Sequence, residues 1–187
     1  MRLFIGIPLT QQVSGELSAL VARLRSGSEA LQSTTLRWTA PDSWHITLQF
    51  LGNATADQLQ CLTTRLAEVR PLPVPVHLGE LGAFDRAGVF FVDVIVSPGL
   101  RALEERVVAA TGQCGFAPET RQYHPHITLA RAKGQWGTEL RDLRARIRAS
   151  HAFSSFTAHE FLLYQSHLGP QGSRYEVRGR FPLGPGH

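Results

Sequence analysis

Apolar positions in the N-terminal half of the chain recur at two spacings, which predict strands and helices in alternation. Residues 2–9 form an apolar run typical of a β-strand. The following segment predicts a helix, because its apolar residues recur at helical spacing; they are Val13, Leu17, Leu20, Val21 and Leu24. A strand is expected at residues 45–51, between a Pro-Asp-Ser turn signal and Gly52. Thr55 and Gln58 are spaced as a capping box, which predicts a helix there and then a strand over 74–84.

The C-terminal half repeats this order of elements. A strand is expected over 89–96, followed by a helix that begins at Ser97-Pro98 and ends near 112–115. A further strand begins at His126, and it is followed by a helix whose apolar residues are Leu140, Leu143 and Ile147. Strands over 156–163 and 175–181 complete the half, the last one after a turn at 169–172.

Both halves therefore have the order β-α-β-α-β, which predicts an α+β fold built by duplication. We expect one domain over residues 1–187, with two like lobes at approximately 1–85 and 86–187 and a link near 85–88. A pseudo-twofold axis between such lobes brings their middle strands together. The expected architecture is bilobal, with antiparallel sheets lining a central cleft and helices outside.

The two middle strands share the tetrapeptide His-Ile-Thr-Leu, at residues 45–48 and 126–129. Because side chains at i and i+2 of a strand lie on one face, His45 shares a face with Thr47, and His126 with Thr128. The isoleucines and leucines form the opposite, apolar face. The repetition predicts one site that contains two histidines.

Composition is that of an ordinary globular protein, with 43% hydrophobic and 18% charged residues. The net charge of +4 comes from arginine, since Lys133 is the single lysine, and arginine suits phosphate groups. No apolar run approaches the roughly 20 residues that span a bilayer, so no membrane is expected. Cys61 and Cys114 follow no secretory pattern, and we expect separate thiols in a reducing cytoplasm.

In its two His-Ile-Thr-Leu motifs and the segments around them, the chain resembles the 2H phosphoesterase superfamily, and within it the RNA 2',3'-cyclic phosphodiesterases, historically called 2'-5' RNA ligases. The resemblance is carried by the segments MRLFIGIPL, RWTAPDSWHITLQFLG, HPHITLAR and YEVRGRFPL. It implies metal-free hydrolysis of an RNA 2',3'-cyclic phosphate end to a 2'-phosphate, without a cofactor. We also expect a cytoplasmic monomer that needs no protein partner.

The same resemblance implies the roles of individual residues. His45 is the expected proton donor to the departing O3', and His126 the expected base that activates water. Thr47 and Thr128 are expected to bind the non-bridging phosphate oxygens, and Arg131 to add positive charge. The chemistry is reasonable without the family, because opening a cyclic phosphodiester needs a base and an acid on opposite sides of phosphorus. Histidine serves in either role near neutral pH.

Several residues keep a purely structural alternative. Threonine is common in strands, and strict alternation puts Arg131 on the face opposite His126 unless the strand ends or bulges there. His124 is either a rim contact or a turn residue. Base recognition is undetermined, since Trp44, Phe84 and Tyr123 near the motifs are more often core residues. A structural role is expected for the unpaired histidines, which are His77, His151, His159, His167 and His187.

Two other functions stay open from the sequence. A zinc hydrolase would use His45, His124 and His126 as ligands, although such a site leaves the repeated threonines unexplained. An RNA-end binding module, or a 2'-5' RNA ligase that runs the reverse transesterification, would use the same motifs.

Overall fold

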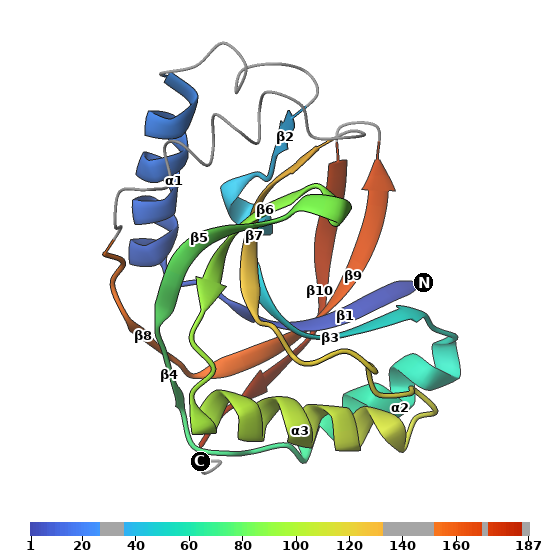
Figure 1. Ribbon diagram of the computed structural model, residues 1–187. Helices are drawn as coiled ribbons and strands as arrows, with labels where there is room; N and C mark the ends of the chain where they lie inside the picture. The colour runs from blue at the N-terminus through green and yellow to red at the C-terminus, as the bar shows by residue number, and fades with distance from the viewer. Residues whose placement is uncertain (27–35, 133–151, 170–171, 185–187) are drawn as a thin grey trace.

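The computed structural model describes residues 1–26, 36–132, 152–169 and 172–184, which form two four-stranded antiparallel sheets (Figure 1). Sheet A has the strand order β10 (Gly172–Pro182), β9 (Glu160–Gly169), β1 (Arg2–Pro8) and β3 (His45–Asn53). Sheet B has the order β2 (Leu36–Trp38), β7 (His126–Ala132), β6 (Val89–Val94) and β5 (Leu78–Phe84). A third pair consists of β4 (Val74–Val76) and β8 (Phe156–Ala158). The expected α+β class with antiparallel sheets is confirmed.

Each sheet takes strands from both halves of the sequence. In sheet A, β1 and β3 of the first half lie beside β9 and β10 of the second, and sheet B mixes the halves in the same way. The segment expected to link two lobes forms a single turn, η3 (Asp85–Ala87), between the paired strands β5 and β6. The division of the sequence into two repeats near residue 85 therefore stays a prediction. Both four-stranded sheets contain strands from each side of this point.

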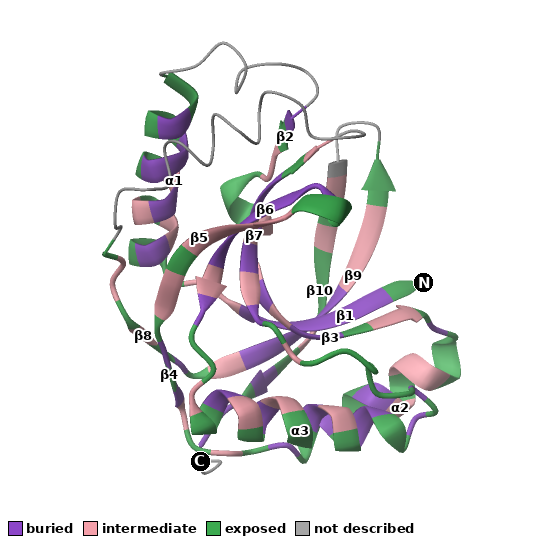
Figure 2. Cartoon of the chain, viewed as in Figure 1, coloured by how far each residue is buried: buried purple, intermediate pink, exposed green. Residues whose placement is uncertain are grey.

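Three helices in the described residues cover the sheets as the apolar spacing predicts. Helix α1 (Gln11–Ser26) buries the five residues named from its pattern. Helix α2 (Ala56–Ala67) begins with the predicted capping box, in which the Thr55 hydroxyl accepts from the Gln58 amide and the Gln58 side chain accepts from the Thr55 amide. Helix α3 (Pro98–Gly112) is capped by Ser97, whose hydroxyl accepts from the Leu100 amide. Figure 2 shows the buried side of each helix turned toward the sheets.

Two runs predicted as single strands are each divided between sheets. The run over 74–84 changes partner at His77, and the run that begins at 156 changes partner at His159. Strand β2 is only three residues long, too short for its spacing to be recognised in the sequence. The helix expected to carry Leu140, Leu143 and Ile147, and turn residues 170–171, lie outside the described residues.

One main hydrophobic cluster unites the helices with one face of each sheet. Ile46 and Leu48 of β3, and Ile127 and Leu129 of β7, are at most 3% exposed and belong to this cluster. The apolar halves of both tetrapeptides therefore anchor their strands in the core. Within the described ranges, no helix has the length and apolar character needed to cross a membrane.

The expectation of two separate thiols is wrong, because Cys61 and Cys114 form a disulfide. Cys61 lies on α2 and Cys114 lies just beyond the end of α3, and their Cα atoms are 5.8 Å apart. The two helices pack side by side (Figure 1), which brings together cysteines separated by 53 positions in the sequence. A spacing rule cannot detect such a pair. The bond also removes the argument for a reducing compartment, which rested on free thiols.

Candidate active site

His45 is the first residue of β3 and has a fixed ring orientation. Its Nδ1 lies 2.8 Å from the backbone oxygen of Ser43, the last residue of the 3-10 turn η2 (Pro41–Ser43). A carbonyl oxygen only accepts, so Nδ1 carries the hydrogen and Nε2 remains for chemistry. The ring packs 4.6 Å from the Phe4 ring and 5.2 Å from the Tyr175 ring, measured between centroids.

His126 is the first residue of β7 and is held in the same way. Its Nδ1 lies 2.8 Å from the backbone oxygen of His124, again two residues earlier in the chain. The rings of Phe84 and Phe91 each lie 5.2 Å from the His126 ring. Both histidines therefore have one ring nitrogen bound to their own backbone and aromatic support for the ring.

The two motif strands carry a β-bulge at the same position after the threonine. On β3, Thr47 pairs with Gly6 and Gln49 pairs with Ile5, so that Leu48 is the extra residue. On β7, the extra residue is Leu129. Both strands begin with the same alternation of half-buried and buried residues, followed by two buried residues and an exposed one. The duplication therefore extends from residue identity to the register of the sheet.

This bulge decides the direction of Arg131. Thr128 pairs with Phe91, and Arg131 pairs with Val89, two residues away on β6. Paired residues share a face, and so do residues two apart on one strand, so Arg131 lies on the face of Thr128 and His126. Strict alternation in the sequence predicted the opposite face, with a bulge as the exception, and the bulge is present.

The five residues singled out from the sequence lie on what we call the histidine face of each sheet. For sheet A this face carries His45, Thr47, Phe50, Phe4, Tyr164 and Tyr175. For sheet B it carries His126, Thr128, Arg131, Phe91 and Phe84. Strands β3 and β7 are in contact, and the positive charges of His126 and Arg131 act on the His45 ring. Thr47 and Thr128 are half-buried on these faces.

The two histidines and Arg131 lie close enough for their charges to interact. Burial lowers the pKa of His45 to about 4, against the hydrogen bond to Ser43, and the positive charges of His126 and Arg131 act in the same direction as burial. Burial also lowers the pKa of His126, and the charges of His124 and Arg131 add to this effect, whereas the His124 carbonyl and Asp93 oppose it. Both imidazoles are therefore neutral at pH 7 in the absence of a bound anion.

Residues beside the motifs have supporting roles that the sequence left open. The Nε2 atom of His124 lies 2.9 Å from a carboxylate oxygen of Asp93, at the exposed edge of the site. Tyr123 donates its hydroxyl to the backbone oxygen of Thr47 at 3.2 Å, which links the segment before β7 to β3. Trp44 is buried in the core. Phe84 contacts His126 and is half-buried.

Sequence reasoning missed the aromatic residues of sheet A. Phe4, Tyr164 and Tyr175 surround His45 but come from strands far from the motif in the sequence. Phe50 was detectable, because it holds the same motif position as Arg131, five residues after the histidine.

Two other histidines among the described residues have side-chain partners away from the motifs, and His159 is exposed between β8 and β9. His77 is bonded to Ser155 at 2.7 Å, and His167 is bonded to Glu176 at 2.9 Å. Among the residues that the structure describes, no three His, Cys, Asp or Glu side chains are grouped so that they could hold a metal ion. His151 and His187 lie outside these residues.

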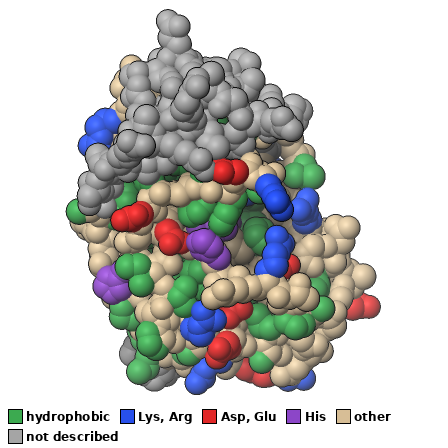
Figure 3. All heavy atoms as spheres, viewed as in Figure 1, with side chains coloured by type: hydrophobic (Ala, Val, Ile, Leu, Met, Phe, Trp, Pro, Cys, Tyr) green, Lys and Arg blue, Asp and Glu red, His purple; other side chains and the backbone are tan. Residues whose placement is uncertain are grey.

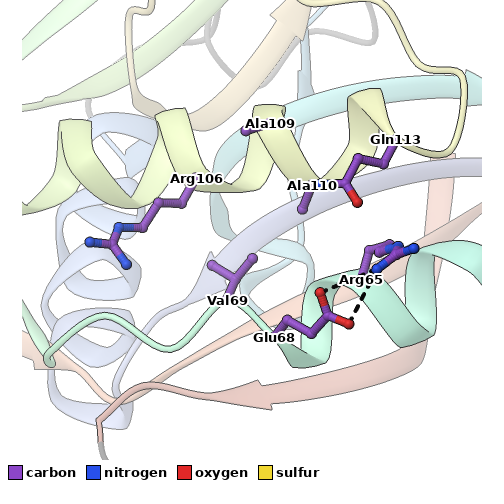
Figure 4. A pocket seen from close by; sticks show the side chains of 7 residues that line it. All are labelled: Arg65, Glu68, Val69, Arg106, Ala109, Ala110 and Gln113. Carbon is purple, nitrogen blue, oxygen red and sulfur yellow. Dashed lines mark hydrogen bonds and ion pairs between the residues drawn. The ribbon is translucent and has the colours of Figure 1, made fainter.

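The molecular surface also has features unrelated to the motifs. A cavity of about 200 Å³ lies between α2 and α3 and is lined by Arg65, Glu68, Val69, Arg106, Ala109, Ala110 and Gln113 (Figure 4). Arg65 is already paired with Glu68 at 3.4 Å, and the cavity contains none of the residues predicted from the sequence.

Figure 3 shows histidine side chains near the middle of one molecular face, with basic side chains on one side and acidic ones on the other.

Comparisons with known proteins identify relatives over almost the whole chain. A family model described as the 2'-5' RNA ligase superfamily matches residues 9–170. A Bacillus subtilis protein named RNA 2',3'-cyclic phosphodiesterase is 30% identical over 185 residues, which cover 96% of this chain and 95% of that protein. An Aeropyrum pernix protein of the same name is 36% identical over 118 residues, 61% of this chain and 66% of that one.

Solved structures show the same fold at lower identity. The crystal structure of E. coli LigT in apo form is 24% identical, has a TM-score of 0.77, and covers 97% of this chain and 96% of its own. A crystal structure from Thermus thermophilus is also 24% identical, with a TM-score of 0.74 and 98% of each chain covered.

Proposed function

Because the chain belongs to the 2'-5' RNA ligase superfamily, we propose that it hydrolyses 2',3'-cyclic phosphate ends of RNA to 2'-phosphates. Relatives named for this activity align along nearly the full length of the chain. The observation that carries the proposal is the duplicated, bulged His-x-Thr strand, which presents an imidazole and a threonine on one face of β3 and again on one face of β7. The substrate is an RNA or a nucleotide that ends in a cyclic phosphate.

The reaction needs an acid and a base on opposite sides of phosphorus. In the proposed mechanism, Nε2 of His126 takes a proton from water as the water oxygen bonds to phosphorus. The bond from phosphorus to O3' breaks, and Nε2 of His45 gives its proton to O3'. The proton count balances, since one imidazole gains the proton that the other loses. The backbone bonds at Nδ1 leave Nε2 of each ring for these transfers.

Thr47, Thr128 and Arg131 stabilise the phosphate in this mechanism. Hydroxyl donors on rigid strands need little reorganisation as charge accumulates on the non-bridging oxygens. Arg131 lies on the same face as His126 and Thr128, so its guanidinium adds positive charge there. No step requires a metal ion or an organic cofactor.

Binding of the negatively charged phosphate also favours a singly protonated histidine pair. Without an anion, burial and the nearby positive charges lower the pKa of both rings. The negative charge of the cyclic phosphate acts in the opposite direction, so binding favours the form in which the pair holds one proton. In this scheme the substrate completes the acid–base pair.

A product assay tests the proposal directly. The protein is incubated with a 2',3'-cyclic nucleotide and the products are identified by phosphorus NMR. A 2'-phosphate is the expected product, whereas a 3'-phosphate would reverse the donor and acceptor roles of the two histidines. Unchanged substrate would leave an RNA-end binding role, and joining of a 5'-hydroxyl RNA to the cyclic end would identify a ligase. Turnover that EDTA abolishes and zinc restores would favour the zinc hydrolase.

Substitution of the histidines tests the mechanism separately. His45→Ala and His126→Ala should each lower kcat by roughly 10²- to 10⁴-fold, the usual contribution of one proton transfer. The double variant should lose less than the product of the two effects, because both groups serve one step. His77→Ala is the matched control, since His77 is exposed and bonded to Ser155 outside the site. Near-normal turnover in either motif variant, with folding intact by circular dichroism, contradicts the mechanism.

A further inference from the structure

The carbonyl group that orients the His45 ring is fixed by a local turn. It belongs to Ser43, the last residue of η2. The amides of Ser43 and Trp44 donate to carbonyl oxygens earlier in this turn, at 2.9 and 3.2 Å. The Trp44 side chain is buried in the main core, which holds the end of the turn against β3. The first motif therefore needs no side-chain contact to place its orienting carbonyl.

The carbonyl group that orients the His126 ring is fixed in a different way. It belongs to His124, in a part of the chain without regular secondary structure, and the next residue, Pro125, has no amide hydrogen to bond within a turn. Instead, Nε2 of His124 donates to the Asp93 carboxylate at 2.9 Å. The carbonyl oxygen of Pro125 accepts from the Val94 amide at 3.1 Å. Two neighbouring residues of β6 therefore hold the chain on either side of the orienting carbonyl.

Asp93 is also the residue of β6 that pairs directly with His126. Residues that pair in this way lie next to each other on one face of the sheet, so the carboxylate and the ring share the histidine face. Its negative charge opposes the fall in the pKa of His126 that burial causes. The matching position beside His45 is occupied by Pro8 of β1. The charges that act on His45, from His126 and Arg131, are both positive.

This difference between the two motifs suits a base at His126. A base becomes positively charged when it takes a proton from water, and a neighbouring carboxylate stabilises that charge. The side chains of His124 and Asp93 are 50% and 44% exposed, and ion pairs with such exposure contribute little to folding stability. The pair therefore affects the placement of the His126 ring more than it affects the fold.

We propose that Asp93 and His124 are positioning residues for His126. Asp93 holds the side chain of His124, the carbonyl of His124 holds Nδ1 of His126, and Nε2 of that ring is thereby kept available for the attacking water. Both residues act through His126 and exchange no proton with the substrate. The proposal rests on the proposed function, in which His126 is the base, and adds the contacts that suit the second motif histidine to this role.

The first test removes the contact and keeps the backbone carbonyl. His124→Ala should lower kcat for 2',3'-cyclic AMP by roughly 10- to 100-fold, the cost of a small displacement of a reacting group, with KM nearly unchanged. His124→Gln keeps an N–H donor at similar reach and should retain most of the wild-type kcat. His167→Ala is the matched control. Nε2 of His167 also lies 2.9 Å from a carboxylate, that of Glu176, on the face of sheet A opposite Tyr175.

The second test removes only the negative charge. Asp93→Asn keeps an acceptor for His124, but His126 then holds a proton less strongly, so the alkaline limb of the kcat/KM profile should move to lower pH. The other charged or titratable groups that act on the ring are unchanged; they are His45, His124 and Arg131. Glu176→Gln removes the same charge from the control pair and should leave the profile in place. An unmoved alkaline limb in Asp93→Asn overturns the role of the charge.

Nuclear magnetic resonance of the His126 ring nitrogens gives a readout that needs no turnover. The wild-type ring should be the Nδ1–H tautomer, and His124→Ala should show a mixture of both tautomers. Wild-type kcat in His124→Ala, or an equal loss in His124→Ala and His167→Ala, overturns the proposal. A fall in unfolding temperature that accounts for the lost rate also overturns it, since the contact would then be structural. If the wild-type protein does not hydrolyse the nucleotide, the proposed function fails, whereas the ring resonances still test the positioning.

Discussion

Arg131 is the residue whose role depends most on local backbone geometry. The bulge at Leu129 turns it to the histidine face, where its charge acts on both imidazoles. We expect Arg131→Gln to lower kcat/KM by about 10- to 100-fold, the loss of one charge-assisted contact to phosphate. Arg106→Gln makes the same change of charge on α3, away from the histidines, and should have no such effect. Steady-state kinetics with a cyclic nucleotide check this, and equal losses in both variants contradict it.

The lowered pKa values of the two histidines predict that the pH profile of kcat/KM is shifted to acid pH. A histidine with a lowered pKa holds its proton only at lower pH, so the single-proton form of the pair is centred below the ordinary value of about 6.5. The optimum of kcat/KM, which reports the free protein, should therefore lie below pH 6.5. The kcat profile should lie at higher pH, because bound phosphate favours the protonated form. An optimum of kcat/KM above pH 7 contradicts this prediction.

Among the elements, strand β1 supports the site through a residue without a side chain. A Cβ atom at Gly6 would lie 2.9 Å from the backbone oxygen of Ile46 and 3.4 Å from Cδ2 of His45. Gly6→Ala must therefore move β1 away from β3 or move the His45 ring. We expect it to lower the free energy of unfolding by about 1–3 kcal/mol, the usual cost of overpacking. It should also reduce kcat, since the acid loses its position.

Gly15→Ala is the matched control for this substitution. Gly15 lies on the exposed side of α1, and a Cβ there meets nothing within 4 Å. The substitution should stabilise the helix by about 0.5–1 kcal/mol and leave kcat unchanged. Thermal unfolding and initial rates measure both effects. Wild-type stability and kcat in the Gly6 variant would show that β1 tolerates the extra atom.

The elements also show how far sequence reasoning reaches. Spacing found the helices, because apolar stripes and the Thr55–Gln58 box are local signals. It did not find where the runs beginning at Val74 and Phe156 change sheets, since partner choice depends on residues distant in the sequence. Phe50 was indicated only by its position five residues after His45, which matches that of Arg131. The face on which it lies is set by a bulge that the pairing with β1 reveals.

At the scale of the whole molecule, the two sheets bring the separate motifs to one place. Each motif strand has its apolar face in the common core, and strands β3 and β7 are in contact. On the other face, the charges of His126 and Arg131 act on His45. The exchange of strands between halves ties this arrangement together, because neither half of the sequence completes a sheet alone. We therefore expect the site and the fold to be lost in one unfolding transition.

The disulfide between Cys61 and Cys114 adds to the stability of the whole fold. Cys61 and Cys114 close a loop across 53 positions, and a cross-link of that length contributes about 4 kcal/mol in the chain-entropy model, with about 2–4 kcal/mol typical of measurement. Cys61→Ser and Cys114→Ser should each lower the free energy of unfolding in urea by that typical amount. Reductant should destabilise the wild-type protein and leave both variants unchanged. The bond joins α2 to the end of α3, and α3 contacts β3 through Thr111 and Gln49 on its core face, not on its histidine face. At temperatures where the variants remain folded, kcat should therefore be retained. An unfolding midpoint of the wild-type protein that does not respond to reductant would show that the cross-link does not stabilise the fold.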